Sequence, residues 1–181
     1  MNKITKLGKN GKIAIAGLCI IVLVMAVGIY GISKSPSTTQ SVATDTQPQT
    51  NGTSSAHATS DYTTKVKSIS TNANDVLNDS YTTLQKYGNG AIDQDTAVSR
   101  LQKNKASLSN ALTEIQSLTP PQKLQHFHSL LVSGFQDLNQ ALTLEISGIQ
   151  NSNMNDIQSA ADITDNAISK LKQAQQEINQ S

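Results

Sequence analysis

A run of twenty residues from Ile13 to Ile32 contains no charged residue, no Asn and no Gln. A helix needs about 20 apolar residues to cross a hydrocarbon core of roughly 30 Å. The sequence therefore predicts one transmembrane signal-anchor helix over residues 13–33. Everything that follows this helix must then fold on one side of the membrane.

The charges before this segment indicate its orientation. Four lysines and no acidic residue precede it, namely Lys3, Lys6, Lys9 and Lys12. Positively charged flanks stay on the cytoplasmic side of a membrane. We therefore expect residues 1–12 to form a cytoplasmic basic segment, with the C-terminal domain outside the cell membrane and attached to it by a single N-terminal span.

Two other interpretations treat the apolar segment as a processed signal. A secretory signal has an apolar stretch of about 7–15 residues followed by a small-residue cleavage site. This stretch is longer and ends at Ile32-Ser33-Lys34, but cleavage there would release a secreted soluble protein. Lipidation of Cys19 would instead give a lipoprotein, although a bulky Leu18 directly precedes that cysteine.

Residues 34–60 are predicted to form a disordered linker rich in Ser and Thr. From Ser35 to Ser60, 13 of 26 residues are Ser or Thr, and Val42 is the only sizeable apolar side chain. Such a segment buries too little apolar surface to offset the conformational entropy that it would lose on ordering. We expect it to connect the span to a folded domain over residues 61–181.

Beyond residue 60, apolar residues recur every three or four positions, which is the period of an amphipathic helix. There are four such runs, separated by short polar segments, and no strand pattern competes with them. The apolar positions extend from Tyr62 to Leu84, from Ala97 to Leu118, from Leu124 to Ile149 and from Met154 to Ile178. The domain is therefore predicted to be all-α.

Local signals indicate where these helices begin and end. Gly88-Asn89-Gly90 is typical of a helix stop and turn. Asp93 is predicted to cap the second helix. Thr119-Pro120-Pro121-Gln122 matches a capping box, with the Thr as the cap, the first Pro at the first helical position and the Gln three residues after the cap.

Charged residues are placed to complement the dipole of the fourth helix. Asp156 lies in its predicted first turn, and Lys170 and Lys172 lie near its predicted end. Negative charge near the first turn and positive charge near the last turn both stabilise a helix. We expect these three residues to contribute in that way.

Four helices joined by short loops favour an antiparallel, up-down-up-down four-helix bundle. Leu, Ile and Ala must form most of its core, because aromatic residues make up only 3% of the chain. Ser68, Thr71, Ser80 and Thr82 weaken the first run. A three-helix arrangement with the first helix splayed away is therefore the alternative.

Composition excludes several classes of partner and site. The formal net charge is +1, there is no Trp, and the sequence has no stripe of basic residues interleaved with aromatic residues. Nucleic-acid binding requires such a basic surface, so we expect no nucleic acid as a partner. A single cysteine excludes a disulfide framework and a Cys-based zinc site.

No catalytic motif is present, so we predict no enzyme activity, no cofactor and no metal site. The sequence has no Gly-x-Ser-x-Gly turn, no phosphate-binding glycine loop and no paired Glu-x-x-His motif of the di-iron bundles. One cluster survives, because Glu114, His126, His128 and Glu177 are expected at the bundle end where the linker enters. It is either a metal or pH-sensing site, or an ordinary core-edge His128 beside an exposed His126.

Five polar residues fall at or next to helix-packing positions: Asn104, His128, Glu145, Thr164 and Gln175. Polar residues at such positions commonly specify the register of helix packing. Alternatively, they line a polar groove for a small ligand between helices.

One family resemblance starts from Leu118-Thr119-Pro120-Pro121, with Leu124, His128, Leu131 and Ala141-Leu142 downstream. In these residues and in its layout, the chain resembles a loose group of uncharacterised envelope proteins of Gram-positive bacteria. Those proteins combine an N-terminal anchor or lipid signal, a Ser/Thr-rich tether and a small helical bundle. The resemblance implies an extracytoplasmic location and no activity.

Together these features predict a membrane-anchored, extracytoplasmic helical-bundle protein of the bacterial cell envelope. We expect it to act as a protein-interaction module without catalytic activity, with another envelope protein as its partner. The first alternative is a ligand-sensing domain that acts through a partner membrane protein. The second is a secreted soluble bundle, if the N-terminal segment is cleaved.

Overall fold

The structure, a computed structural model, describes the backbone of residues 52–179 and the side chains of residues 57–179. These residues are all-helical, as predicted, and contain no strand. The elements are α1 (Gly52–Gly88), α2 (Gln94–Ser117), the short 3-10 helix η3 (Gln122–Leu124), α3 (Gln125–Asn151) and α4 (Met154–Ile178).

The predicted cytoplasmic segment and the predicted transmembrane helix over residues 13–33 lie outside the described residues, as does the linker up to residue 51. Among the helices that the structure describes, none combines the length and the apolar character that a membrane span requires.

Helix α1 begins at Gly52, whereas the sequence pattern assigns its first turns to the linker. The buried Tyr62 anchors the helix against the core. Growth from an existing helix gains a hydrogen bond per residue without a new nucleation cost, so polar residues can extend it. The Thr63 hydroxyl also donates to the carbonyls of Thr59 and Ser60, 3.0 Å from each, which accommodates a Thr within the helix.

The connection from α1 to α2 confirms the predicted stop and cap. Helix α1 ends at Gly88, and Gly90 has a φ of 76°, a left-handed conformation that favours glycine. The Asp93 carboxylate accepts a hydrogen bond of 2.8 Å from the backbone N–H of Thr96. The contact with Thr96 lowers the pKa of Asp93.

The predicted capping box after α2 is wrong. The backbone is extended at Leu118 and again at Pro121, and helical structure starts only at Gln122. A proline disfavours the helical conformation for the residue before it, so Pro121 prevents a helix from starting at Pro120. Thr119 is therefore left in an extended segment and does not cap the helix.

A tight turn connects α3 to α4. Ser152 adopts a left-handed conformation with a φ of 53°, and its N–H bonds back to the carbonyls of the last turn of α3. The Asn153 side chain then caps α4 by accepting from the N–H of Asn155 at 3.1 Å. Asp156 lies in the first turn of α4, as predicted, and also accepts from the Ser147 hydroxyl at 2.8 Å.

The two lysines expected at the end of α4 lie inside it instead. Helix α4 continues to Ile178, and its last turn contains no basic residue. The favourable effect of a cation on the helix dipole is confined to the last turn, so Lys170 and Lys172 do not provide it. Lys170 forms an ion pair of 2.6 Å with Asp137 of α3.

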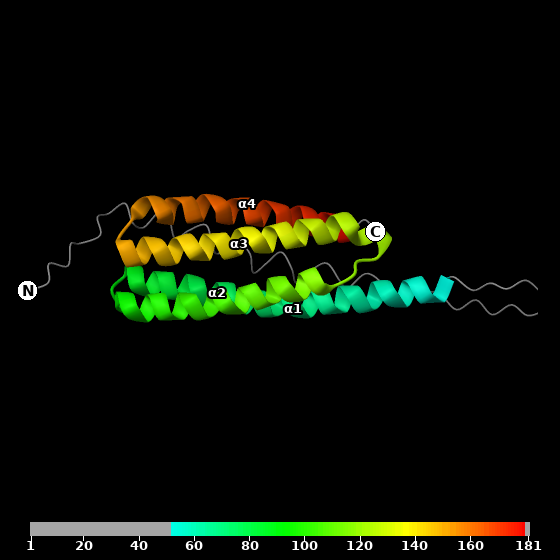
Figure 1. Cartoon of the computed structure of the whole chain (residues 1–181), viewed down its shortest axis with the longest axis horizontal. Coiled ribbons are helices and arrows are strands. Elements are labelled where there is room, and N and C mark those ends of the chain that lie inside the picture. The colour runs from blue at the N-terminus through cyan, green and yellow to red at the C-terminus, as the bar shows by residue number, and fades with distance from the viewer. Residues whose placement is uncertain (1–51, 180–181) are drawn as a thin grey trace, which may run out of the picture.

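The four long helices lie along the long axis of the molecule, and each packs against the next one in the chain (Figure 1). The contacts show that α2 and α3 run in opposite directions. Gln94, at the start of α2, donates to the carbonyl of Gln150 near the end of α3 at 3.1 Å. Ser109, further along α2, donates to Asn139, which lies earlier in α3, at 2.8 Å.

Helices α3 and α4 are also antiparallel and approach each other most closely. A Cβ atom at Gly148 would lie 2.6 Å from Cδ1 of Ile157, and one at Gly134 would lie 2.8 Å from Cδ2 of Leu171. Small residues repeat every seven positions on both sides of this contact, as Gly134, Ala141 and Gly148 on α3 and as Ala160, Ala167 and Ala174 on α4. Their size permits the close approach.

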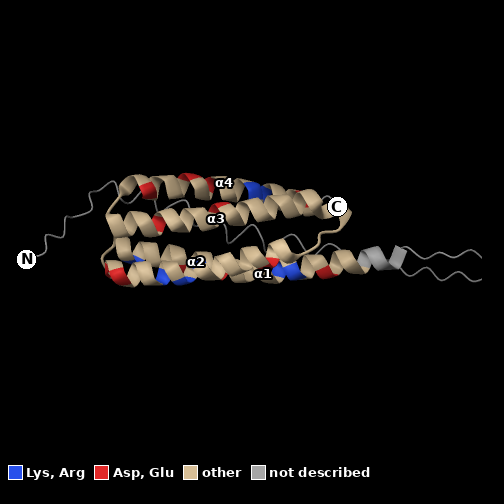
Figure 2. Cartoon of the chain, in the orientation of Figure 1, with Lys and Arg blue, Asp and Glu red and all other residues tan. Residues whose placement is uncertain are grey.

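The core is built mainly from aliphatic side chains contributed by all four helices. Its fully buried large residues are Leu101, Leu108, Ile115, Leu124, Leu131, Phe135 and Leu138. Figure 2 shows charged residues spaced along the helices, with most of the ribbon uncharged. Apolar packing is therefore the main source of cohesion between the described helices.

Candidate functional site

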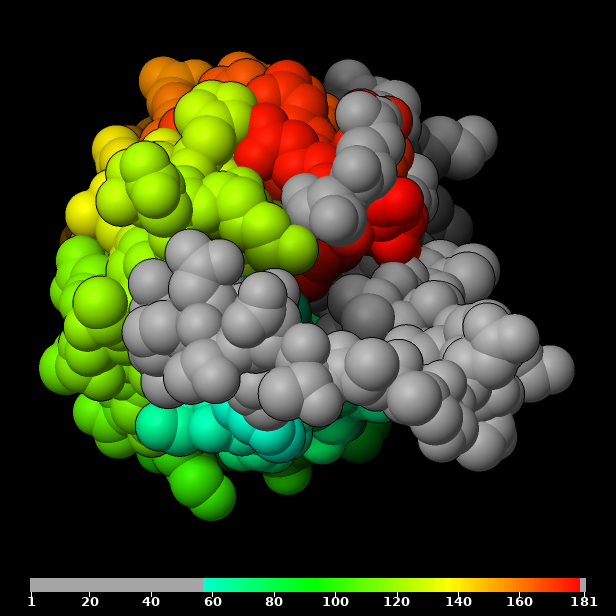
Figure 3. Space-filling model, turned by 90° about the vertical axis from the view of Figure 1, so that its right-hand side faces the viewer, coloured from blue at the N-terminus to red at the C-terminus, as the bar shows by residue number. Residues whose placement is uncertain are grey.

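Two members of the predicted end cluster meet at one end of the molecule. His126 Nδ1, in the first turn of α3, contacts Glu177 Oε1, in the last turn of α4. Figure 3 looks onto this end and shows the start of α3 in yellow-green beside the end of α4 in red. The side chain of His126 is 75% exposed and that of Glu177 is 35% exposed, so solvent screens the pair.

His128 lies two residues further along α3, on another side of the helix, and contacts α1. Its Nδ1 is 2.9 Å from the hydroxyl of Tyr62, whose ring packs edge-on against Phe127 at a centroid distance of 6.3 Å. Burial raises the pKa of Tyr62 to about 12 and lowers the pKa of His128. These directions favour a neutral imidazole whose Nδ1 accepts a hydrogen bond from the Tyr62 hydroxyl, a contact that connects α1 to the start of α3.

The structure thus brings together only part of the predicted cluster. Glu114 is exposed on α2, His126 pairs with Glu177, and His128 pairs with Tyr62. Among the side chains that the structure describes, no three His, Cys, Asp or Glu residues gather closely enough to hold a metal ion.

A polar contact inside the core links α1 to α2. Asn104 is 7% exposed, and its side-chain amide donates to the Asp79 carboxylate at 2.8 Å and to the Ser80 hydroxyl at 3.0 Å. The Ser80 hydroxyl in turn donates to the carbonyl of Val76 at 3.0 Å. Asn104 therefore fixes the register of these two helices, because a shift along either helix would leave its buried amide without these hydrogen-bond partners.

Among the buried polar residues that the structure describes, Glu145 has the largest pKa shift. It is 6% exposed, and its Oε2 atom has no hydrogen-bond partner among the described side chains. Burial raises the pKa of its carboxyl to about 8, so the group is mostly protonated at neutral pH. The helix register places the buried Thr83 of α1, whose hydroxyl is also unpartnered, at about the same level along the axis.

The polar residues predicted at or next to helix-packing positions, which we call seam residues, include two more on α4. Thr164 is buried on α4, and its hydroxyl donates to the carbonyl of Ala160 at 2.8 Å. Gln175 is partly exposed near the end of the same helix. Of the five seam residues, Asn104, Glu145 and Thr164 are buried, as packing positions should be.

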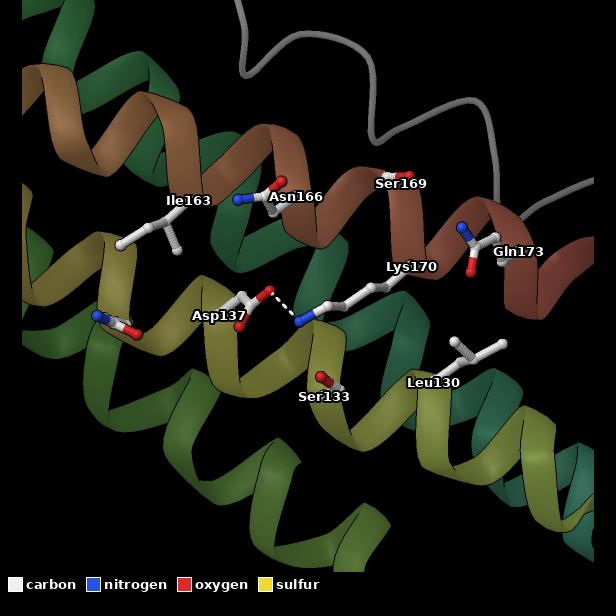
Figure 4. Close-up of a pocket in the computed structure, with 9 residues that line it drawn as sticks. Leu130, Ser133, Asp137, Ile163, Asn166, Ser169, Lys170 and Gln173 are labelled. Atoms are coloured by element: carbon white, nitrogen blue, oxygen red, sulfur yellow. Dashed lines mark hydrogen bonds and ion pairs between the residues drawn. The ribbon is translucent and has the colours of Figure 1, made fainter.

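A shallow groove runs along the outer surface between α3 and α4 (Figure 4). Its volume is about 630 Å³, and most of the residues that line it have polar side chains. Leu130 and Ile163 provide its apolar part, and the ion pair between Lys170 and Asp137 crosses it. The polar lining comprises Ser133, Asp137, Gln140, Asn166, Ser169, Lys170 and Gln173.

Sequence reasoning misses this groove. Lys170 is assigned to the dipole of α4, and Asp137 carries no assignment at all. The two residues are 33 positions apart, and only the antiparallel register of α3 against α4 brings them together. The presence of a basic residue on one helix and an acidic residue on the other is compatible with an ion pair. The pairing can be predicted only when the register of the two helices is known.

No family model, curated protein sequence or solved structure matches this chain.

Proposed function

We propose that this chain is a single-pass membrane protein of the bacterial cell envelope, with a cytoplasmic N-terminus and an extracytoplasmic domain. The domain forms an antiparallel, up-down-up-down four-helix bundle and acts as a protein-interaction module without catalytic activity. The linker and the first turns of α1 connect the bundle to the anchor.

The topology rests on the N-terminal sequence. Its support is a charge-free apolar segment of the length of a membrane span, preceded by four lysines and no acidic residue. The described domain starts within twenty residues of the predicted span, which leaves a short connection between membrane and bundle.

The observation that carries the interaction role is the groove between α3 and α4. Its two aliphatic side chains, its hydroxyl and amide lining and its central ion pair resemble the polar, partly apolar make-up of a transient protein interface. The closely packed α3 and α4 provide a rigid base for it, because Gly134 and Gly148 leave little room for the two helices to shift.

Protease shaving tests the topology. An epitope tag placed after Ser181 is expected to disappear when intact cells or protoplasts are treated with protease, together with a known surface protein. A tag on the N-terminus should survive the same treatment. Survival of the C-terminal tag while the surface control is removed would overturn the proposed topology.

In-cell photocrosslinking tests the interaction surface. A photoreactive residue in place of Asn166, which is exposed in the groove, is expected to capture an envelope protein identifiable by mass spectrometry. The matched control is Asn110, which is exposed on α2. Equal capture from both positions, or none from Asn166, would contradict a role for the groove.

The alternative is a ligand-sensing domain that acts through a partner membrane protein, and the same groove favours it. A ligand that binds only the folded state raises the midpoint of thermal unfolding. Screening the protein against metal ions and small solutes is therefore informative. Flat responses across the screen would exclude the tested compounds and favour a protein partner.

A further inference from the structure

Helix α1 is the helix of the described domain with the most polar buried face. Four of the seven buried polar residues belong to it, namely Thr63, Ser70, Ser80 and Thr83. Two of these, Ser70 and Thr83, have hydroxyl oxygens without a hydrogen-bond partner among the described residues. An unpartnered buried hydroxyl has lost its hydration and has gained no replacement. The two buried hydroxyl groups therefore weaken the packing of α1 against the other helices.

The opposite side of the domain is packed differently. Helices α3 and α4 are in such close contact that a methyl group at Gly148 would overlap the side chain of Ile157. Their ion pair between Lys170 and Asp137 also spans this contact. Close packing of this kind resists separation, because small displacements lose many contacts together.

Helix α1 is attached to the rest of the domain through one short chain connection and through side-chain contacts. A short connection around Gly90, the glycine with a left-handed backbone, joins it to α2. Its hydrogen bonds to the rest of the domain include those of Tyr62 with His128 and of Asn104 with Asp79 and Ser80. The N-terminal turns of α1 project past the ends of the other helices (Figure 1).

We propose that α1 is a displaceable cover of the core, which undocks by turning about its connection to α2 and exposes a seat for an amphipathic helix of a partner protein. The seat is shaped for a helix, since it now holds α1. On α2, Leu101, Leu108 and Ile115 repeat every seven residues and are fully buried, in the same core cluster as the apolar residues of α1. A partner helix with aliphatic residues opposite this row matches the seat better than the hydroxyls of Ser70 and Thr83.

This inference deepens the proposed interaction role and rests on it for the identity of the partner, but its physical test does not depend on membrane topology. Hydrogen exchange of the full chain in detergent, read by mass spectrometry, measures the opening of each helix separately. Amides of α1 from Tyr62 onwards are expected to exchange at least about tenfold faster than those of α3. Equal protection of all four helices would overturn the proposal.

Variants test whether the buried hydroxyls cause the opening. Replacing them together, as Ser70→Ala and Thr83→Val, is expected to slow exchange in α1 at least about threefold while leaving α3 unchanged. The matched control replaces two exposed residues of the same helix, as Ser68→Ala and Thr71→Val. A similar slowing in both double variants would overturn the assignment of the opening to the hydroxyls.

A peptide tests the vacated seat. The probe is a fluorescent synthetic peptide of residues 57–88 that carries Ser70→Ala and Thr83→Val. It is expected to bind the full chain, with a rate that becomes independent of peptide concentration because the opening of α1 limits it. Absence of binding would overturn the helix-accepting seat, whatever the outcome of the shaving experiment on topology.

Discussion

The carboxyl group of Glu145 lies inside the packed helices, where an ionised carboxylate would lose its hydration. The protein keeps the group neutral, since burial raises its pKa from 4.5 to about 8. A neutral acid is less costly to bury than a carboxylate, although Oε2 still lacks a partner among the described residues. This one residue therefore makes the stability of the domain depend on pH.

The sign of that dependence follows from proton binding. Folded Glu145 holds its proton up to about pH 8, whereas the unfolded chain releases it near its ordinary pKa of 4.5. Its contribution is fully present below pH 4.5 and is lost as pH rises towards 8. Between pH 4.5 and 7 the contribution of Glu145 to the free energy of unfolding should fall by roughly 3 kcal/mol. Glu145→Gln cannot ionise and should remove most of this fall.

Urea unfolding at a series of pH values measures this effect. The control variant is Glu114→Gln, which changes an exposed carboxyl and should retain the pH dependence of the native protein. Identical pH profiles for the native protein and Glu145→Gln would show that Glu145 is not the group responsible.

At the scale of elements, the contact between α3 and α4 reverses a general rule about glycine. Replacing Gly by Ala inside a helix normally stabilises it by about 1 kcal/mol. At Gly148, however, the added Cβ would lie 2.6 Å from Ile157 Cδ1 and 3.0 Å from the carbonyl oxygen of Asn153. Whether Gly148→Ala raises or lowers the free energy of unfolding therefore shows how closely the two helices pack.

Gly148→Ala should lower the free energy of unfolding by about 1–2 kcal/mol, because overpacking outweighs the gain in helix propensity. Ile157→Val removes the Cδ1 atom that meets the new methyl group. In the Gly148→Ala background it should cost less than it does alone, since it relieves the part of the overlap that involves Cδ1. A stabilising effect of Gly148→Ala in chemical unfolding would contradict the close approach of the two helices.

The two helix starts at Asp93 and after Thr119 are each decided by interactions between neighbouring residues in the chain. Asp93 caps α2 as predicted because its contact with Thr96 involves neighbours in the chain. The capping box at Thr119 fails for an equally local reason, the effect of Pro121 on the residue before it. Its motif matches, but the second proline excludes the backbone conformation that the motif requires.

For the whole molecule, apolar packing dominates over charge. The described residues contain ion pairs of His126 with Glu177 and of Lys170 with Asp137, all with appreciable solvent exposure. Exposed ion pairs contribute about 0–1 kcal/mol each and are screened by salt. The core, in contrast, gathers aliphatic residues from all four helices.

The stability of the full chain in detergent should therefore respond weakly to salt. Raising NaCl from about 0.05 M to about 0.5 M is expected to change the free energy of unfolding by less than about 0.5 kcal/mol. Urea unfolding at the two salt concentrations measures the difference. A loss of more than about 1 kcal/mol at high salt would mean that charge interactions hold the helices together.

The sequence by itself determines the helical class, the apolar face of each helix and the cap at Asp93. These features depend on residues within one or two turns of each other, so periodicity and local hydrogen bonding suffice to predict them. The sequence also places His128 and Glu145 at packing positions, but it does not identify their neighbours.

Only the tertiary structure decides those neighbours. The pairing of His128 with Tyr62 and of Lys170 with Asp137 depends on how far one helix is shifted and rotated against another. That register is set by packing over the whole contact, including the close approach at Gly134 and Gly148. The predicted end cluster separates into different contacts for this reason, because residues that share an end of a bundle need not share a face.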